Sequence, residues 1–443
     1  MLTREEALKI CETVLGAVKA AGAEDASVAV NGSLESHARF ADNRITTSGH
    51  AENLDITATV WVERRRGTVS GNDASGDALK RMATEVVQIA RVSPVHREYV
   101  PTLGSLEYGQ SRSFAESTER VDLNARAAAL AAALEVCRGA KVTGAGFHRA
   151  TAFAGAVATA NGNRRYFRSS AADFSMTARS ADGTGSGYYA GDHFDLARLD
   201  VRQIAQQAVT KAVRSQQPKA IEPGNYQVIL EPQAVADLIG FLVNSLDARS
   251  AEEGRSAFAA KEGKTRIGEK MFSERLNLVS DPLHAELPAI PATGEGIPAG
   301  RLSMINSGVL ENLEYSRFWA RERKRDATAG PVNFILENTQ PAVPLEQMIK
   351  EVKRGLLITR FWYVRLVDPR TILLTGLTRD GLWLVENGEI RYPVRNLRFN
   401  QSVLAMLAPW NVEAVGAPQR RFPFMVPPLK LASFTFTSMS DAI

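Results

Sequence analysis

The chain has 443 residues, of which 44% are hydrophobic and 23% are charged. These fractions are typical of a soluble globular protein, and the length predicts two or three domains because one hydrophobic core rarely spans so many residues. The 53 basic and 49 acidic residues leave a net charge of only +4. The basic clusters Arg64–Arg66 and Arg321–Arg325 are short. We therefore interpret them as solvated strand or helix ends and expect no nucleic-acid partner.

The sequence favours a reducing compartment and carries no membrane signal. Cys11 and Cys137 are the only cysteines, and both lie in apolar helical patterns, so buried thiols are expected rather than a disulfide. The N-terminal segment MLTREEALKI has no apolar stretch behind a basic start, and no window holds the roughly 18 apolar residues of a membrane span. We therefore expect a cytoplasmic protein without a membrane partner.

Residues 1–110 are predicted to form an N-terminal α+β domain. Thr3 and Glu6 form a capping box that opens a helix, and Gly22 ends it. Residues 93–111 contain two prolines and are interpreted as a linker. The other predicted elements are strands over 26–30, 35–40 and 54–62 and a helix over 76–92.

Residues 111–222 are predicted to form a middle α+β domain. Helices are expected over 118–137 and 199–215, and the glycine-rich segment 183–191 is expected to be a loop. The predicted strands are 144–148, 153–160, 165–174 and 175–180.

Residues 223–443 are predicted to form a β-rich C-terminal domain. Short strands separated by turn signals dominate, and one long helix is expected from Pro232 towards Ala251. The fold class is therefore α+β, with N-terminal helix-plus-sheet modules followed by a mostly antiparallel β sandwich or barrel-like domain with one embedded helix.

The most informative segment is 375–407, with the sequence TGLTRDGLWLVENGEIRYPVRNLRFNQSVLAML. Within it, 382–385 and 390–394 flank Asn387-Gly388, which supplies the two positive-φ residues of a type I′ turn, so a β-hairpin is predicted. The same segment resembles the C-terminal signature of the TldD/PmbA family, which was once described as modulators of DNA gyrase and is related to metallopeptidases.

Further segments resemble the family and occur in the family's order. Each is weak alone, but together they identify the chain as similar to a TldD/PmbA member. These segments are 43–73, 159–189, 228–232, 294–298, 307–310 and 328–330.

The catalytic branch of this family carries a His-Glu-x-x-x-His helix, whose histidines bind zinc and whose Glu acts as a general base on a metal-bound water. Counting from the strand 228–230 places Gly240, Phe241 and Ser245 at the His, Glu and His positions. Glycine and phenylalanine offer no ligand or proton-transfer group, and serine is a poor zinc ligand. The resemblance thus implies no metal and no catalytic residue at these positions.

A shifted register does not restore the zinc site. No histidine lies between His193 and His284, and the C-terminal cysteine that supplies a further ligand in the catalytic branch is absent here, because none follows Cys137. Asp182, Asp192, His193 and Asp195 are a formal alternative for a hard cation, but Gly/Asp clusters form turns far more often than metal sites. The apolar spacing around Phe241 favours a buried core helix.

The resemblance implies the non-metal, PmbA/TldE-like branch. We expect a subunit of a cytosolic TldD/TldE-type metallopeptidase that degrades or trims unfolded peptides, with this chain shaping the peptide cavity and holding no cofactor. Zinc and the general base would come from a TldD-like paralogue that carries the HExxxH motif. Glu295, Gly296, Arg379 and Asp380 are the candidate residues of a peptide or partner surface.

Two other hypotheses remain open at this point. In the first, the chain is a stand-alone homodimer that binds peptides and is catalytically silent. Less favoured is an enzyme that hydrolyses its substrate through residues outside any recognised motif. A neighbouring reading frame with HExxxH would favour the heteromeric peptidase.

Overall fold

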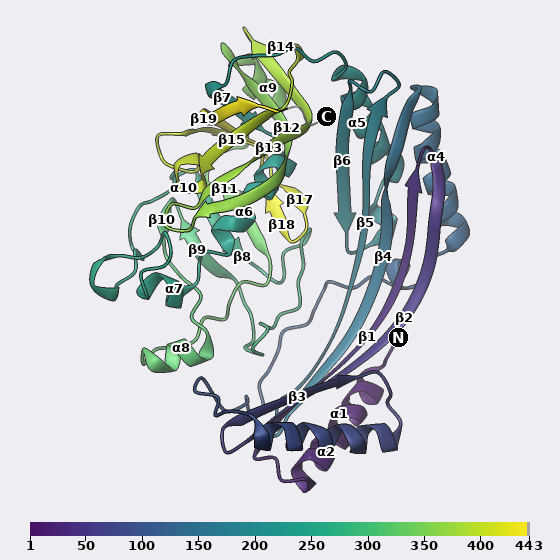
Figure 1. Ribbon diagram of the computed structural model, residues 1–443, viewed down its shortest axis with the longest axis vertical. Coiled ribbons are helices and arrows are strands. Elements are labelled where there is room, and N and C mark those ends of the chain that lie inside the picture. The colour runs from purple at the N-terminus through teal and green to yellow at the C-terminus, as the bar shows by residue number, and fades with distance from the viewer. Residues whose placement is uncertain (441–443) are drawn as a thin grey trace.

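The computed structural model describes residues 1–440 as two parts that face each other (Figure 1). One part is a tall curved sheet with helices on its outer face, and the other is the β-rich C-terminal half. None of the helices within residues 1–440 is long and apolar enough to cross a membrane.

One antiparallel sheet of six strands runs through both predicted N-terminal domains, in the order β3-β2-β1-β4-β5-β6. The residue partners of β1 and β4 extend from Ser27–Thr159 to Phe40–Gly146, so the sheet is continuous across the predicted boundary at residue 110. The strands are β1 (Asp25–Ala41), β2 (Arg44–Val62), β3 (Arg65–Gly71), β4 (Val142–Thr159), β5 (Arg164–Ser180) and β6 (Ser186–His193).

These strands are longer than the sequence predicted. The predicted strands 26–30 and 35–40 form one strand because Asn31 and Gly32 do not turn and instead pair with both β2 and β4. In the same way, the four strands predicted between 144 and 180 merge into β4 and β5. Small and polar residues inside a strand were misinterpreted as breaks, although pairing on both sides keeps the backbone extended.

The predicted loop 183–191 was also wrong, because β6 occupies most of it. Gly187 and Gly191 lie within β6 and mark the close approach of α5 (Val201–Arg214). A Cβ on Gly187 would lie 2.2 Å from the carbonyl oxygen of Ala208, and one on Gly191 would lie 2.6 Å from Ile204. Glycine inside a strand often signals such an approach of another backbone.

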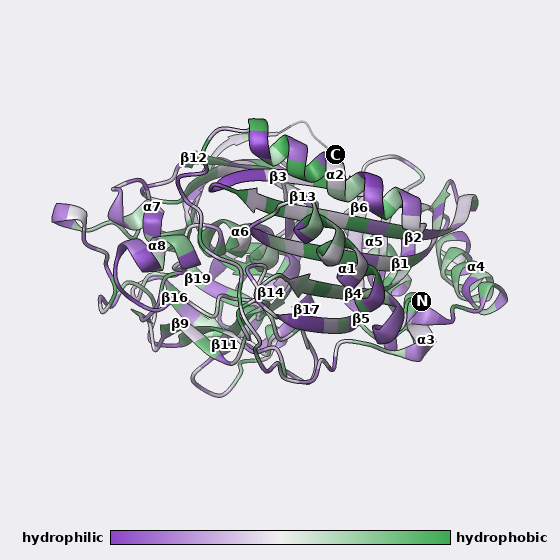
Figure 2. Cartoon of the chain, turned by 90° about the horizontal axis from the view of Figure 1, so that it is seen from below, coloured by the Kyte–Doolittle hydropathy of each residue, from purple (hydrophilic) through white to green (hydrophobic). Residues whose placement is uncertain are grey.

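Helices cover the outer face of this sheet at its two ends, leaving two separate cores (Figure 1). Thr3 and Glu6 form the predicted capping box, and the helix predicted over 76–92 is confirmed. Hydrophobic and hydrophilic residues alternate along α2 in Figure 2, as expected for a helix with one buried face. The helices are α1 (Arg4–Ala20) and α2 (Gly76–Val92) at one end, and α4 (Leu123–Gly139) and α5 (Val201–Arg214) at the other.

The helix predicted over 118–137 begins later than expected. A short helix, α3 (Glu116–Glu119), comes first, and Asp122 then caps α4 by accepting hydrogen bonds from the backbone of Asn124 and Ala125. Asp is a strong N-cap, so it starts a new helix where the apolar pattern alone suggested continuity.

The inner face of the sheet carries many polar side chains. On β5 the alternating residues Arg165, Ser169, Asp173 and Thr177 lie on this face, opposite residues of β4 that alternate in the same way. The C-terminal half lies over this face in Figure 1, and residues of both parts line the cavities between them.

The C-terminal half contains a closed five-stranded barrel, which confirms the predicted fold class. The barrel closes because β12 pairs with β13 as well as with β7. Its strands are β7 (Gly224–Leu230), β12 (Arg354–Asp368), β13 (Leu373–Glu386), β15 (Leu397–Ser402) and β19 (Leu429–Met439), with β14 (Glu389–Pro393) and β16 (Val412–Val415) attached.

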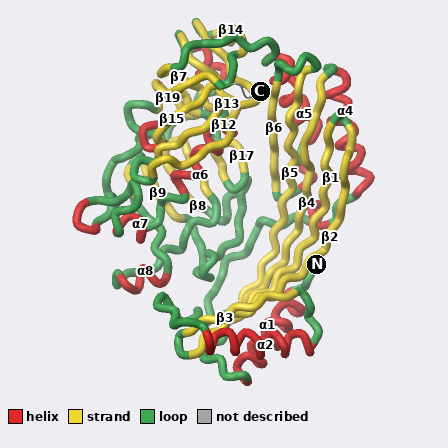
Figure 3. The backbone as a smooth tube through the Cα atoms, in the orientation of Figure 1, coloured by secondary structure: helices red, strands yellow, loops and turns green. Residues whose placement is uncertain are grey.

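A second sheet of six strands packs beside the barrel, in the order β10-β9-β8-β11-β18-β17. Loops gather in this region, opposite the lower part of the tall sheet (Figure 3). The strands are β8 (Leu276–Ser280), β9 (Leu302–Asn306), β10 (Val309–Leu310), β11 (Phe334–Asn338), β17 (Gln419–Arg421) and β18 (Phe424–Val426).

The embedded helix is shorter than predicted. Helix α6 (Pro232–Val243) ends before Asn244, and Asp247 caps a separate helix, α7 (Ala248–Glu252), by accepting from the backbone of Ser250. The remaining C-terminal helices have at most six residues each and are α8 (Arg317–Glu322), α9 (Leu345–Lys350) and α10 (Val403–Met406).

The predicted hairpin is confirmed, since β13 and β14 are joined by Asn387 at φ 52° and Gly388 at φ 78°. Both central residues therefore have the positive φ of a type I′ turn. A Cβ on Gly388 would also lie 2.8 Å from the carbonyl oxygen of Lys350.

We predict that Gly388→Val lowers the free energy of unfolding by about 1–3 kcal/mol, because a β-branched residue is strained at positive φ. Urea denaturation measures this effect. Gly16→Ala is the matched control, because Gly16 lies within α1 and a Cβ there meets nothing within 4 Å. That variant should be neutral or slightly stabilising. An unchanged midpoint for Gly388→Val would contradict the strain argument.

Candidate functional site

The positions that sequence analysis assigned to the zinc motif lie on and just after α6. Strand β7 leads into it, and Pro232 occupies its first turn, where the missing N–H costs no hydrogen bond. Leu238, Ile239 and Leu242 bury one face of the helix in the C-terminal core. The opposite side of α6 is directed towards the inner face of the tall sheet and lines a cavity there.

The residues at the motif positions do not fit a zinc ion. Gly240 has room for a Cβ, whose nearest contact would be Phe424 at 3.5 Å. Phe241 is partly buried and packs against the core, as the core-helix interpretation predicted. Ser245 lies beyond the end of α6 and donates its hydroxyl to the carbonyl oxygen of Phe241 at 2.7 Å. These groups provide one hydroxyl, which is already engaged, and no imidazole, thiolate or carboxylate.

Within residues 1–440, His, Cys, Asp and Glu side chains nowhere come together in a group of three or more that could hold a metal ion. The four residues considered for a hard cation have other contacts. Asp182 accepts hydrogen bonds from Ser180 and Thr184 in a turn, and Asp195 caps a short 3-10 helix. Asp192 pairs with Arg420.

A cavity of about 470 Å³, which we call the helix cavity, separates α6 from β5 and β6. Asp237 of α6 lines it, and its carboxylate accepts hydrogen bonds from the backbone N–H of Phe361 at 2.8 Å and from Gln233 at 2.8 Å. Burial nevertheless raises the pKa of Asp237 to about 6, because desolvation outweighs both hydrogen bonds and the more distant charge of Arg360.

Charged residues from three elements surround Asp237 in the helix cavity. Asp173 on β5 pairs with Arg149 on β4 at 3.0 Å, and burial raises the pKa of Asp173. Arg421 lines the same cavity, and its Nε has no hydrogen-bond partner within residues 1–440. Tyr188 on β6 also lines it, and burial raises the pKa of its phenol. The cavity therefore offers both donors and acceptors to a polar ligand.

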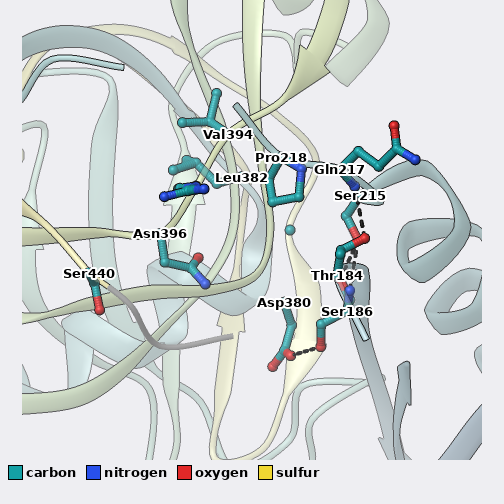
Figure 4. Close-up of a pocket in the computed structure, with 12 residues that line it drawn as sticks. Thr184, Ser186, Ser215, Gln217, Pro218, Asp380, Leu382, Val394, Asn396 and Ser440 are labelled. Atoms are coloured by element: carbon teal, nitrogen blue, oxygen red, sulfur yellow. Dashed lines mark hydrogen bonds between the residues drawn. The ribbon is translucent and has the colours of Figure 1, made fainter. Parts of the chain in front are cut away.

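A second cavity, of about 430 Å³, lies between β6 and β13, and we call it the upper cavity. Figure 4 shows Ser186 donating to the carboxylate of Asp380 across the boundary between the two parts of the molecule. Asp380 also pairs with Arg360 at 2.6 Å, and its side chain is 0% exposed. Arg360 in turn lies 3.8 Å from the centroid of the Tyr188 ring.

A third cavity, of about 400 Å³, lies at the foot of the tall sheet, and we call it the lower cavity. Glu295 and Gly296 line it. Glu295 accepts a hydrogen bond from the backbone of Arg317 at 2.8 Å, and the Gly296 carbonyl accepts from Tyr108 at 2.7 Å.

The four candidate surface residues therefore do not form one surface. Glu295 and Gly296 line the lower cavity, whereas Asp380 lines the upper cavity. Asp380 is 1% exposed and Arg379 is half-buried, so neither presents an open surface patch. The sequence could not separate these pairs, because the burial of Asp380 depends on β6, which lies almost 200 residues earlier.

Sequence analysis missed the residues of the helix cavity. Asp192, which lines this cavity, was considered only for a cation, and Asp173, Tyr188 and Asp237 were not considered as site residues. A weak signal was present, because polar residues alternate along β5 and β6. That alternation marks an exposed or cavity-lining face, but it does not indicate which element covers it.

Comparison with known protein families places the chain in a metallopeptidase-related class. Two domain models match it, namely PmbA/TldA metallopeptidase domain 1 over residues 26–90 and the PmbA/TldA metallopeptidase C-terminal domain over residues 223–438. The chain belongs to the TldD/PmbA family.

Two curated relatives are similar over part of their length. A metalloprotease of Methanothermobacter thermautotrophicus is 23% identical over 240 residues, which cover 51% of this chain and 50% of that protein. The metalloprotease PmbA of Escherichia coli O157:H7 is 27% identical over 186 residues, which cover 41% of this chain and 39% of PmbA. The chain thus spans half or less of the length of these relatives.

Solved structures share the fold over almost the whole chain. TldE from Thermococcus kodakarensis has a TM-score of 0.87 at 18% identity and covers 97% of this chain and 100% of its own. A proposed DNA gyrase modulator from Bacteroides thetaiotaomicron has a TM-score of 0.86 at 18% identity, with 99% and 100% covered. A similar protein from Thermotoga maritima has a TM-score of 0.83 at 17% identity, with 97% and 100% covered.

The raised pKa of Asp237 predicts a specific pH dependence of stability. The folded carboxyl keeps its proton up to about pH 6, whereas the unfolded one loses it around the ordinary value of 3.8. Between these pH values the folded state binds one proton more than the unfolded state. The contribution of Asp237 to the free energy of unfolding therefore falls as pH rises from about 4 to about 6. The loss should reach about 3 kcal/mol above pH 6.

Asp237→Asn should remove this dependence, so the stability of the wild type relative to the variant should fall between pH 4.5 and pH 7. Urea denaturation at several pH values measures the difference. Glu107→Gln is the control, because Glu107 is exposed and makes no ion pair or hydrogen bond within residues 1–440. The plot of its free energy of unfolding against pH should stay parallel to that of the wild type. Parallel curves for Asp237→Asn would refute the predicted pKa.

Proposed function

We propose that this chain is the non-metal subunit of a TldD/TldE-type peptidase that degrades or trims unfolded peptides. The observation that carries the proposal is α6, which keeps the position and core packing of a motif helix while Gly240, Phe241 and Ser245 replace its functional groups. In this arrangement a paralogue with the HExxxH motif supplies zinc and the general base, and this chain holds no metal. We propose a cytoplasmic location for the assembly.

The helix cavity supports a role in positioning peptide. It lies between α6 and the polar face of the tall sheet, and Asp173, Asp237 and Arg421 offer acceptors and donors there. A polypeptide carries one N–H and one C=O per residue, so a polar wall of this kind suits its backbone. The hydrolytic step itself is assigned to the partner.

An exposed strand edge supports the proposed association through the C-terminal domain. Strand β12 pairs with β7 only up to Ile358, so from Thr359 to Asp368 its pairing is limited to β13. This segment also exposes apolar side chains. They are Trp362, Tyr363, Leu366 and Val367, with exposed fractions of 39%, 65%, 45% and 55%. Exposed apolar residues on an unpaired edge are typical of a surface that another chain covers.

The alternative is a homodimer of this chain that binds peptides and is catalytically silent. The same β12 edge would then contact a second copy, and the same cavities would hold the peptide. The two proposals differ in the partner, so an association experiment separates them.

We predict that co-expression with a HExxxH-bearing paralogue yields a complex that co-elutes in size exclusion and cleaves unfolded peptides. Replacing Leu366 and Val367 together by Glu should abolish co-elution, because two charges would be buried in the interface. Val92→Glu is the control, because Val92 is 84% exposed on α2, far from β12 in Figure 1. If the chains elute separately and the paralogue alone cleaves equally well, the homodimeric alternative is the better account.

We also predict that the purified chain binds no stoichiometric zinc and shows no chelator-sensitive peptide cleavage. Gly240→His combined with Ser245→His should not create a zinc site, because Ser245 lies outside α6 and no orienting partners or Glu base accompany the new imidazoles. Elemental analysis and the melting temperature with and without zinc measure this, with the paralogue as positive control. About one zinc per chain, or a melting temperature that zinc raises, would refute the prediction.

A further inference from the structure

The lower cavity contains arginines without acidic partners. Arg66, Arg165 and Arg317 line it, and within residues 1–440 none of their guanidinium groups has a carboxylate oxygen within 4.0 Å. Arg165 instead donates to the carbonyl oxygen of Thr293 at 3.2 Å. Burial lowers the pKa of Arg165, because it removes water from a charge that no carboxylate compensates.

The acidic residues of the same cavity are already engaged. Glu98 pairs with Arg249 at 2.8 Å, and Glu295 accepts the backbone N–H of Arg317. The lower cavity therefore has an excess of positive charge, whereas Asp173, Asp192 and Asp237 line the helix cavity at the other end of the sheet.

Two further polar atoms at the lower cavity have no hydrogen-bond partner within residues 1–440. They are Nε1 of Trp61 and Nδ1 of His96, and both atoms are buried. Trp61 is opposite Arg66 in the pairing of β2 and β3, so these two side chains lie on the same face of the sheet. Buried polar atoms normally have a partner, and unpaired ones next to a cationic cavity point to a missing ligand.

The lower cavity is linked to the helix cavity along β5. A middle cavity of about 420 Å³, lined by Ser169 and Ala171, shares Gly294 with the lower cavity and shares Ala171 with the helix cavity. Arg165 and Asp173 are eight residues apart on one strand, which corresponds to roughly 26 Å. An extended peptide of about eight residues spans that distance.

We propose that the lower cavity binds the C-terminal carboxylate of an extended peptide, whose backbone runs along the inner face of β5 towards α6. This proposal rests on the proposed function and adds the direction in which the peptide binds. The carboxyl end of the peptide lies at the foot of the sheet, and the preceding residues lie beside α6. A carboxylate suits the site because arginine pairs with it through two parallel hydrogen bonds. Trp61, Tyr99 and Phe318 line the same cavity and provide apolar contact for the last side chain.

The outer edge of β5 does not offer an alternative path in this stretch. Its Ser170 N–H donates to Ser113 at 2.7 Å, and the Ser111 hydroxyl donates to the Arg168 carbonyl at 3.3 Å. Linker residues therefore occupy the edge, and the peptide runs over the face of the sheet.

The test compares one unstructured ten-residue peptide, labelled at its N-terminus with fluorescein, as the free acid and as the C-terminal amide. Binding to the full chain is measured by fluorescence anisotropy. We expect the acid to bind at least about tenfold more tightly than the amide, because charge-assisted hydrogen bonds are lost with the amide. Inorganic phosphate at 10 mM should displace little of the acid peptide, because phosphate makes no contact beyond the lower cavity.

Arg165→Gln and Arg66→Gln should each reduce the ratio between the affinity for the acid and the affinity for the amide. Arg165→Lys should retain part of the preference, because lysine keeps the positive charge but cannot form the bidentate hydrogen bonds of arginine to a carboxylate. Arg214→Gln is the matched control, because it removes one exposed positive charge on α5, away from the cavity. The preference should persist in that variant, which separates the site from an effect of net charge.

Equal affinity for acid and amide, or no binding of either, would overturn the proposal. Full displacement by phosphate would also overturn it and would assign the cavity to a free anion. These outcomes are independent of subunit association. If the chain forms an active complex with the paralogue but shows no preference for the acid peptide, only this inference is refuted. If the chain prefers the acid peptide but does not associate with the paralogue, only the heteromeric function is refuted.

Discussion

The arrangement of the whole molecule depends on a few charged contacts that hold the tall sheet against the C-terminal half. Asp380 of β13, whose side chain is 0% exposed, pairs with Arg360 of the neighbouring β12 and accepts a hydrogen bond from Ser186 of β6 across the boundary. An unsatisfied carboxylate in this position would be costly, so the contact with Ser186 favours the observed position of β6 against the barrel. Buried charges therefore fix the position of one part relative to the other.

Two further ion pairs repeat this pattern on either side of α6. Lys211 of α5 pairs with Glu231, which directly precedes α6, and Asp192 of β6 pairs with Arg420 of β17. Within residues 1–440, each buried apolar cluster belongs to one part alone, so the two parts do not share a hydrophobic core. Polar cavities remain between them, and α6 lies over the polar face of the sheet. The row of cavities along β5 is thus a direct consequence of how the two parts are joined.

The core packing of α6 depends little on the residues that sequence analysis placed at the zinc motif. Leu238, Ile239 and Leu242 are buried in the C-terminal core and Phe241 packs against it, whereas Ser245 lies beyond the end of the helix. The proposed function as a non-metal subunit therefore requires no change in how the helix is held.

The sequence by itself determined the family, the fold class, the capping box of Thr3 and Glu6 and the 387–388 turn, because each depends on residues close together in the chain. The absence of zinc ligands at the motif positions is likewise a prediction from the sequence. Only the tertiary structure decided the lengths of β1, β4 and β5, since polar and glycine residues inside them stay extended through pairing with distant strands. It also decided the burial of Asp380 and the grouping of Arg66, Arg165 and Arg317. Local patterns cannot encode these features, because the packing that creates them joins residues 100 to 250 positions apart.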